Sequence, residues 1–277
     1  SLPLFFPYFV GQLNTFVQKY IAGILGSGMI SSVDYANQFM GILQSVLTSV
    51  LTTVMLPMLS KAYITNNKSN FVYTLKENFK IGMMLYGIAA IFMIGATTPL
   101  CTFFFHRGKV SYESLQLIIN LTKCFGVAFI GIFIYLMGGT ALMADNQRKF
   151  YATVGVTNQI LVLFLNVTLV RVLGVYIFPI SLGIVHFVSG LIMFLKLDIN
   201  GKKDILLFFL RGIIVILIVT FIYNLANPTG VAKHPFEVLV IDFGTLAVSM
   251  PLMALMMGIN VRNLAIKTYN KYIRRQR

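Results

Sequence analysis

Eight long apolar stretches separated by short connections constrain the fold of this chain more than any other feature. They cover residues 2–25, 36–60, 80–105, 115–144, 151–172, 175–196, 205–226 and 236–258. Each is long enough to cross a bilayer as a helix, which takes about 20 apolar residues. Only 11% of the residues are charged, against about 25% in soluble domains. The sequence therefore predicts an all-α fold, a polytopic transmembrane helical bundle of about eight spans.

Lysine and arginine fall mainly on alternate connections between these stretches. Sixteen of them lie in the even-numbered connections and the C-terminal tail, against four in the odd-numbered ones. Because basic residues near span ends stay in the cytoplasm, we expect both termini to be cytoplasmic. The net charge of +14 then reflects topology and attraction to anionic lipid. We expect membrane lipids as partners, no nucleic acid, and a multi-pass location in a bacterial inner membrane.

A polar, glycine-containing linker at Asp198–Asp204 divides the chain into two predicted units. Residues 1–198 form a six-helix transmembrane lobe, and residues 199–277 form a terminal helix pair with a basic cytoplasmic tail. The seventh span is apolar on all sides, which predicts a peripheral position. Between Lys61 and Lys80, apolar residues at i, i+4 and i+8 are compatible with a short amphipathic surface helix or an ordinary polar loop. Since the chain opens with Ser1 instead of methionine, we expect it to be the C-terminal part of a longer protein.

The first two spans each carry a polar stripe several turns long. At 100° per residue, one half of the first span gathers Gly11, Asn14, Thr15, Gln18 and Lys19, with Gln12 at its edge. One face of the second span gathers Asn37, Gly41, Gln44, Ser45, Thr48 and Thr52, with Gln38 beside them. Polar residues inside a span mark either a hydrated cavity or a tight helix–helix interface. The candidate cavity or substrate-binding residues are Gln12, Asn14, Gln18, Lys19, Asn37, Gln38, Gln44 and Thr48.

Three residues are candidates for binding a coupling cation: Gln18, Asn166 and His186. The alternative for His186 is a hydrogen-bonded structural role among apolar neighbours. Lys19 and Lys123 lie near span ends, where a lysine can extend its ammonium group to the membrane surface. The cysteines lack metal-ligand spacing, so we expect no metal site.

No motif of a hydrolase, metalloprotease or nucleotide-binding loop occurs in the sequence, so we expect a protein that is not an enzyme and holds no cofactor. Without a nucleotide site, transport would be driven by a sodium or proton gradient, the membrane potential or an external partner.

Several segments resemble, in order along the chain, the MurJ (MviN) family of lipid II flippases. The stretch from Gly26 to Asn37 resembles the family's G-S-x-S-x-x-x-Y-A segment, and Leu56-Pro57-Met58-Leu59-Ser60 resembles its L-P-x-L-S motif. Phe105–Val110 resembles the family's R-G-x-F turn. Family members have fourteen spans in two six-helix lobes and a terminal pair. The resemblance implies that this chain is the second lobe plus that pair, and that a first lobe is its missing partner.

The resemblance also implies a function. A central cavity would hold the head of a polyprenyl-pyrophosphate-linked glycan, with lipid II as the first choice, and rocking of the lobes would give alternating access for peptidoglycan synthesis. This sequence has Asn37 and Gln38 where many members carry an Asp-Arg pair, and Gln18 where an acidic sodium-site residue falls. Two alternatives remain open: an O-antigen or exopolysaccharide-unit flippase or cation-coupled exporter of the same superfamily, and a non-transporting membrane scaffold.

Overall fold

The computed structural model describes residues 2–65, 68–105, 110–226, 240, 244, 247–248 and 251–258, with side chains from Phe9 onward. In chain order its elements are α1 (Leu2–Leu25), α2 (Met29–Val50), the π-helical turn η1 (Leu51–Met55), α3 (Leu56–Ile64), α4 (Lys68–Gly95), α5 (Thr97–Phe105), α6 (Tyr112–Ala144), α7 (Arg148–Leu173), the 3₁₀ turn η2 (Gly174–Tyr176), α8 (Ile177–Lys196) and α9 (Lys202–Ala226). The described residues contain no strand. The prediction of an all-α bundle is confirmed.

The described part of the chain contains 5 stretches long and apolar enough to cross a membrane, which confirms a polytopic protein. One of them, Arg148–Lys196, has 49 residues and would be about 70 Å long as a single helix. It is instead a hairpin, because Asn158 bonds to Ser189 and Asn166 to Ser181 across α7 and α8. Most of the predicted eighth span, 236–258, lies outside the described residues.

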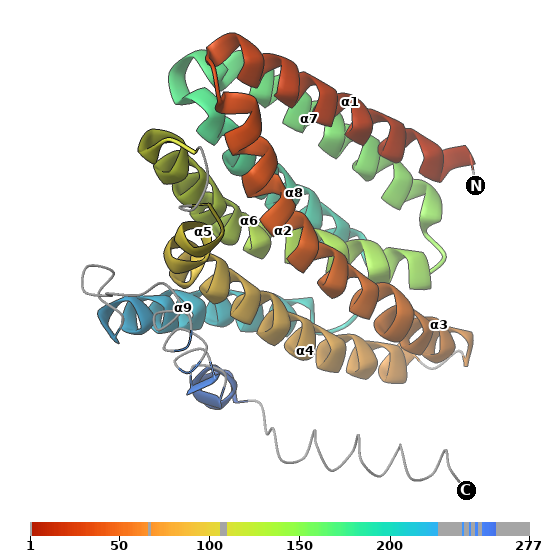
Figure 1. Ribbon diagram of the computed structural model, residues 1–277. Helices are drawn as coiled ribbons and strands as arrows, with labels where there is room; N and C mark the ends of the chain where they lie inside the picture. Colours follow the sequence, from red (N-terminus) through yellow and green to blue (C-terminus); the bar gives the residue numbers. More distant parts are fainter. Residues whose placement is uncertain are drawn as a thin grey trace, which may run out of the picture.

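Successive long helices alternate in direction along the chain (Figure 1). Gly87 and Gly95 of α4 meet Ile216 and Tyr223 of α9, respectively, and because the later residue of α4 meets the later residue of α9, these two helices are parallel. The connections before α4 and after α8 lie at the same end, because Lys68 Nζ is 3.1 Å from Asp198 Oδ2. Connections rich in lysine and arginine therefore share one end of the bundle, as the alternation requires, while the placement of the termini in the cytoplasm stays a prediction.

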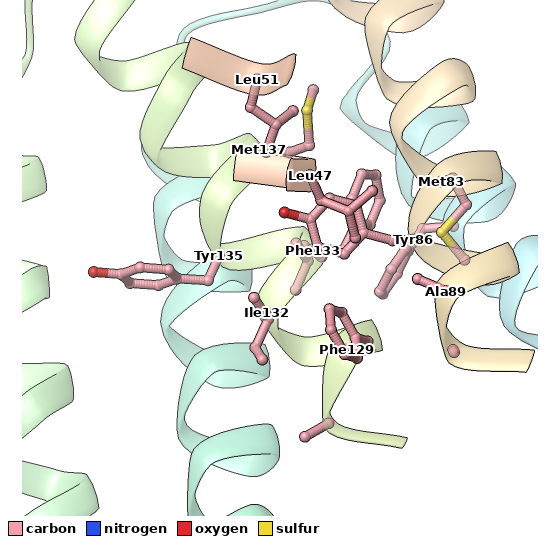
Figure 2. Close-up of a cluster of buried hydrophobic side chains, with 14 of the residues drawn as sticks. Leu47, Leu51, Met83, Tyr86, Ala89, Phe129, Ile132, Phe133, Tyr135 and Met137 are labelled. Atoms are coloured by element: carbon pink, nitrogen blue, oxygen red, sulfur yellow. The ribbon is translucent and has the colours of Figure 1, made fainter. Parts of the chain in front are cut away.

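An aromatic cluster between α2, α4 and α6 forms the centre of the core (Figure 2). The ring of Phe133 lies 4.9 Å from that of Phe79 and 5.3 Å from that of Tyr86. Phe79 belongs to the stripe between Lys61 and Lys80, and its neighbours Phe71 and Leu75 are equally buried. The polar-loop prediction was wrong, and the amphipathic-helix prediction was right about the helix and its apolar face but wrong about its place: the stripe is the first part of the long helix α4, and this face packs inside the bundle.

Glycines set the distance between α6 and α8, which contact each other extensively. A Cβ atom on Gly131 would lie 2.1 Å from the carbonyl oxygen of Gly183, and one on Gly190 would lie 2.6 Å from the backbone of Ile134. Small residues of this kind let helices in lipid approach backbone to backbone. By contrast α9, the predicted peripheral span, packs on α4 and exposes apolar side chains such as Leu207 and Phe221, which confirms its place at the edge.

Candidate functional site

Helix α1 lies beside α7 (Figure 1), and a buried amide joins the two helices. The side-chain nitrogen Nδ2 of Asn14 donates to the backbone oxygen of Gln159 at 2.8 Å and to its Oε1 at 2.9 Å. Asn14 is 4% exposed, and Gly11, one turn away, also faces Gln159. This part of the polar stripe is therefore a helix–helix interface, whereas Asn14 was predicted to be a cavity residue. Gln159 is a partner that the sequence interpretation missed.

The rest of the α1 stripe is open. Gln12, Thr15 and Lys19 are exposed, whereas Gln18 is half-buried beside the packed edge of the helix. Lys19 does not extend alone to the membrane surface, because its Nζ lies 3.0 Å from Oδ2 of Asp34 at the start of α2. Both side chains of this ion pair keep part of their surface free, so the pair joins the open faces of the two helices.

Helix α2 continues this open polar face over its whole length. Gln38, Gly41, Ser45, Ser49 and Thr52 are exposed, and a Cβ atom on Gly41 would meet nothing within 4 Å. The hydroxyls of Ser45, Ser49 and Thr52 donate to carbonyls one turn back in their own helix, which satisfies them without water. The amide of Gln38 has no such bond within the described residues, so it needs a polar surrounding.

Three further predicted residues of α2 border this face. Asn37, Gln44 and Thr48 are all half-buried, on the side of the helix that turns toward the bundle. We call the exposed set on both helices, with these three at its border, the open polar face. Its exposed members are Gln12, Thr15, Lys19, Gln38, Gly41, Ser45, Ser49 and Thr52, and the half-buried Asp34 joins them through its ion pair with Lys19.

A π-helical turn, Leu51–Met55, ends the open polar face. Its Thr52 and Thr53 are exposed and bond to the carbonyls of Thr48 and Ser49. Turns of this kind are uncommon and are found frequently at functional sites, because the extra residue changes the direction of the side chains. The periodicity of the sequence does not predict this turn. The nearest residue that could have indicated a change in the helix is Pro57, two residues after the turn ends.

The predicted cation-binding residues have separate partners. Asn166 is fully buried and its Oδ1 accepts a hydrogen bond from Ser181 at 2.6 Å. The His186 ring lies 2.9 Å from the carbonyl of Leu182 through Nδ1, and 4.6 Å from the ring of Tyr135. Gln18 lies on a third helix, α1, and has no hydrogen bond to either of these residues within the described part of the chain. The structure thus does not bring the three together through a shared partner, and cation binding at them stays a prediction.

The fold first defines a structural class, that of polytopic helical membrane proteins. The chain superposes on a structure of lipid II flippase MurJ in an inward closed conformation with a TM-score of 0.74, at 18% identity over 95% of this chain and 54% of that one. It also superposes on an outward-facing multidrug resistance MATE family transporter with a TM-score of 0.60, at 17% identity over 94% of this chain and 64% of that one.

Sequence comparison then names the family. The model of the lipid II flippase MurJ family matches residues 2–268, so this chain belongs to that family, as the resemblance predicted. The lipid II flippase MurJ of Burkholderia cenocepacia is 24% identical over 72% of this chain, and a probable lipid II flippase MurJ of Helicobacter pylori is 23% identical over 69%. The chain spans 39% and 41% of the length of these two relatives.

Proposed function

We propose that this chain is one lobe, with the terminal helices, of a flippase that moves a polyprenyl-pyrophosphate-linked glycan, lipid II, across the bacterial cytoplasmic membrane. The observation that carries the proposal is the open polar face of α1 and α2. Lipid-exposed polar side chains are costly, so a face with Gln12, Gln38 and an ion pair requires water or polar groups opposite it. The head of a lipid-linked glycan supplies hydroxyls and amides for such contacts.

A second lobe, opposite this one, would complete the cavity. The relatives are more than twice as long as the matched part of this chain, which leaves room for a partner lobe of similar size. Alternating access then requires that the two lobes tilt about the substrate, so that the open polar face meets one side of the membrane at a time. The proposed role of this chain's residues is binding and guidance of the head group, with no chemical step.

For the driving force we propose coupling to an ion gradient or the membrane potential, since no nucleotide-binding motif occurs in the sequence. Gln18, Asn166 and His186 are the candidate cation residues. Dissipating the sodium gradient, the proton gradient and the potential one at a time, with selective ionophores, identifies the source by which of the three stops translocation.

The test removes polarity from the open face without touching the core. The intact protein carrying Gln12→Leu and Gln38→Leu is expressed in cells depleted of their own lipid II flippase, and lipid II reaching the outer leaflet is measured by its cleavage with an added membrane-impermeant enzyme. We expect translocation to fall at least tenfold at an unchanged protein level. Phe16→Leu, on the apolar side of α1, is the matched control and keeps translocation. Normal translocation by the double variant would overturn the assignment of this face.

The similarity to the MATE transporter fold favours a second candidate, export of another amphiphilic molecule by the same face. Depleting this protein in the cells that normally express it distinguishes the two proposals. If depletion leaves lipid II distribution unchanged while another lipid-linked glycan accumulates on the inner leaflet, the second candidate holds and the first is refuted.

A further inference from the structure

Lys123 is a cation inside a membrane helix that no described carboxylate neutralises. It lies eleven residues into α6 (Tyr112–Ala144), about 16 Å along the helix axis. Helix α6 is about 50 Å long, so a hydrocarbon core of about 30 Å centred on it begins some 10 Å from its first residue. Lys123 therefore starts about 6 Å inside the apolar layer, within reach of the head-group level through its four-carbon stem.

A second polar side chain on this part of α6 is that of Asn120. Both residues lie on one side of α6, one turn apart, with Asn120 exposed and Lys123 half-buried. Among the described residues Lys123 takes part in no ion pair, whereas four other lysines, Lys19, Lys68, Lys76 and Lys80, do. An ionisable residue placed within a membrane segment marks a functional site more often than it marks chance. Here the missing component is an anion.

An apolar groove begins directly beside this pair and runs toward the middle of the membrane. It has a volume of about 420 Å³ and lies between α6 and α8, from Cys124 and Pro179 to Gly131 and Phe187. The groove exists because glycines bring the two helices together there, while Val127 and Ile184 stand exposed at its rim. Its size falls within the range of about 300–1,000 Å³ that is typical of ligand pockets.

The polar pair and the apolar groove follow one another along α6, in the same order as the polar head group and the apolar chain of a lipid. Asn120 and Lys123 come first, at the end of the bundle that carries few lysines and arginines, and the groove follows from Cys124 onward. Val127, at the rim of the groove, lies one helical turn beyond Lys123 on the same face of α6. An ammonium, an amide and then an apolar channel fit a phosphate, its glycerol and an alkyl chain.

We propose that Asn120 and Lys123 bind the phosphate of an anionic phospholipid whose acyl chain lies in the α6–α8 groove. The site is on the outside of the lobe, on helices other than α1 and α2, so it is separate from the open polar face and does not depend on the proposed function. Charge selects the lipid: the unpaired ammonium favours a phospholipid with net negative charge over a zwitterionic one, whose own ammonium competes for the phosphate.

Photo-crosslinking tests the proposal in the intact protein, purified into lipid nanodiscs. The probes are phosphatidylglycerol and phosphatidylcholine that carry a diazirine in the acyl chain, and mass spectrometry maps the labelled residues. We expect the phosphatidylglycerol probe to label the groove, at Val127 and Ile184, about five times more than the phosphatidylcholine probe does, the factor expected for one basic residue near the surface. Lys123→Gln removes this preference.

Two matched controls separate the site from general lipid contact. Lys149→Gln removes an exposed cation at the other end of the bundle and should keep the preference. Ile184→Trp fills the mouth of the groove and should lower labelling there with Lys123 intact. Ile192→Trp, at another exposed position of α8 about two turns further on, should not. Equal labelling by both probes, or a preference that survives Lys123→Gln, would mean that Lys123 only extends to water, and the proposal would be wrong.

Discussion

Substituting alanine for Gly131 should separate α6 from α8 and destabilise the whole lobe. The added Cβ would lie 2.1 Å from the carbonyl oxygen of Gly183 and 3.1 Å from the amide nitrogen of Phe187. Both neighbours are backbone atoms, so no side chain can rotate away to make room. An ordinary contact begins near 3.4 Å, so the helices must move apart by about 1.3 Å, a strain of the kind that overpacked cores show.

The size of the loss follows from comparison with two other glycines. Overpacking costs about 1–3 kcal/mol, and we place Gly131→Ala at about 3 kcal/mol because the added Cβ would come within 2.1 Å of a backbone oxygen. In Gly183→Ala the added Cβ would lie 3.1 Å from Ala128, which predicts a loss of about 1 kcal/mol. Gly41→Ala, in open space on α2, should be neutral or gain up to about 1 kcal/mol, since alanine is the better helix former.

The assay is reversible unfolding of the purified protein in mixed micelles by increasing fractions of sodium dodecyl sulfate. Far-ultraviolet circular dichroism follows it, because the chain contains no tryptophan to serve as a fluorescent probe. The predicted order of stability is Gly41→Ala, then Gly183→Ala, then Gly131→Ala. Equal stability of all three variants would refute the claim that backbone contact at glycines holds α6 and α8 together.

Three smaller effects follow from polar contacts. Asn14→Leu should cost about 1 kcal/mol in the same unfolding assay, because interhelical hydrogen bonds in membranes are worth about 0.6–2 kcal/mol, and a cost no larger than that of Thr15→Val would count against the contact to α7. Lys19→Met, which breaks a half-exposed ion pair, should change stability by less than about 1 kcal/mol, and a larger loss would show that the pair is shielded from water. The hydrogen bond from Lys68 lowers the pKa of Asp198 below its ordinary value. This contact therefore stabilises the fold above the ordinary carboxyl pKa, and its contribution is lost as the pH falls through the lowered pKa. Carboxyl-carbon NMR should show the pKa of Asp198 rising in Lys68→Gln and unchanged in Lys149→Gln.

The sequence predicted where the membrane spans lie better than it predicted which spans and side chains contact one another. Apolar length alone located the membrane helices, because the bilayer thickness fixes it. The polar stripe of α1 was also real, yet periodicity places a residue on a face without saying what lies opposite. Asn14 bonds to Gln159, far away along the chain, whereas Gln12 on the same helix stays open. Helical periodicity places Asn14 within the stripe and Gln12 at its edge, but it cannot identify Gln159 as the partner of Asn14.

The stripe of Phe71, Leu75 and Phe79 was misjudged for a related reason. The polar residues around it indicated a surface position, but a helix that enters a bundle can bury one face while lysines on the other face reach water. Lys76 is such a lysine, and its Nζ lies 2.7 Å from Oδ2 of Asp204. Charge and burial are compatible on one turn of a helix, and composition averaged over a segment cannot show it.

The parallel pairing of α4 with α9 has a consequence for biosynthesis. Gly87 and Gly95 of α4 are filled by Ile216 and Tyr223, which the ribosome adds more than a hundred residues after them. At about 5–20 residues per second, the side of α4 that carries these two glycines, whose missing side chains leave notches, spends several seconds in the membrane before α9 has been synthesised. During that interval the insertion machinery, lipid tails or another protein must occupy the notches, and α9 then displaces that occupant when it arrives.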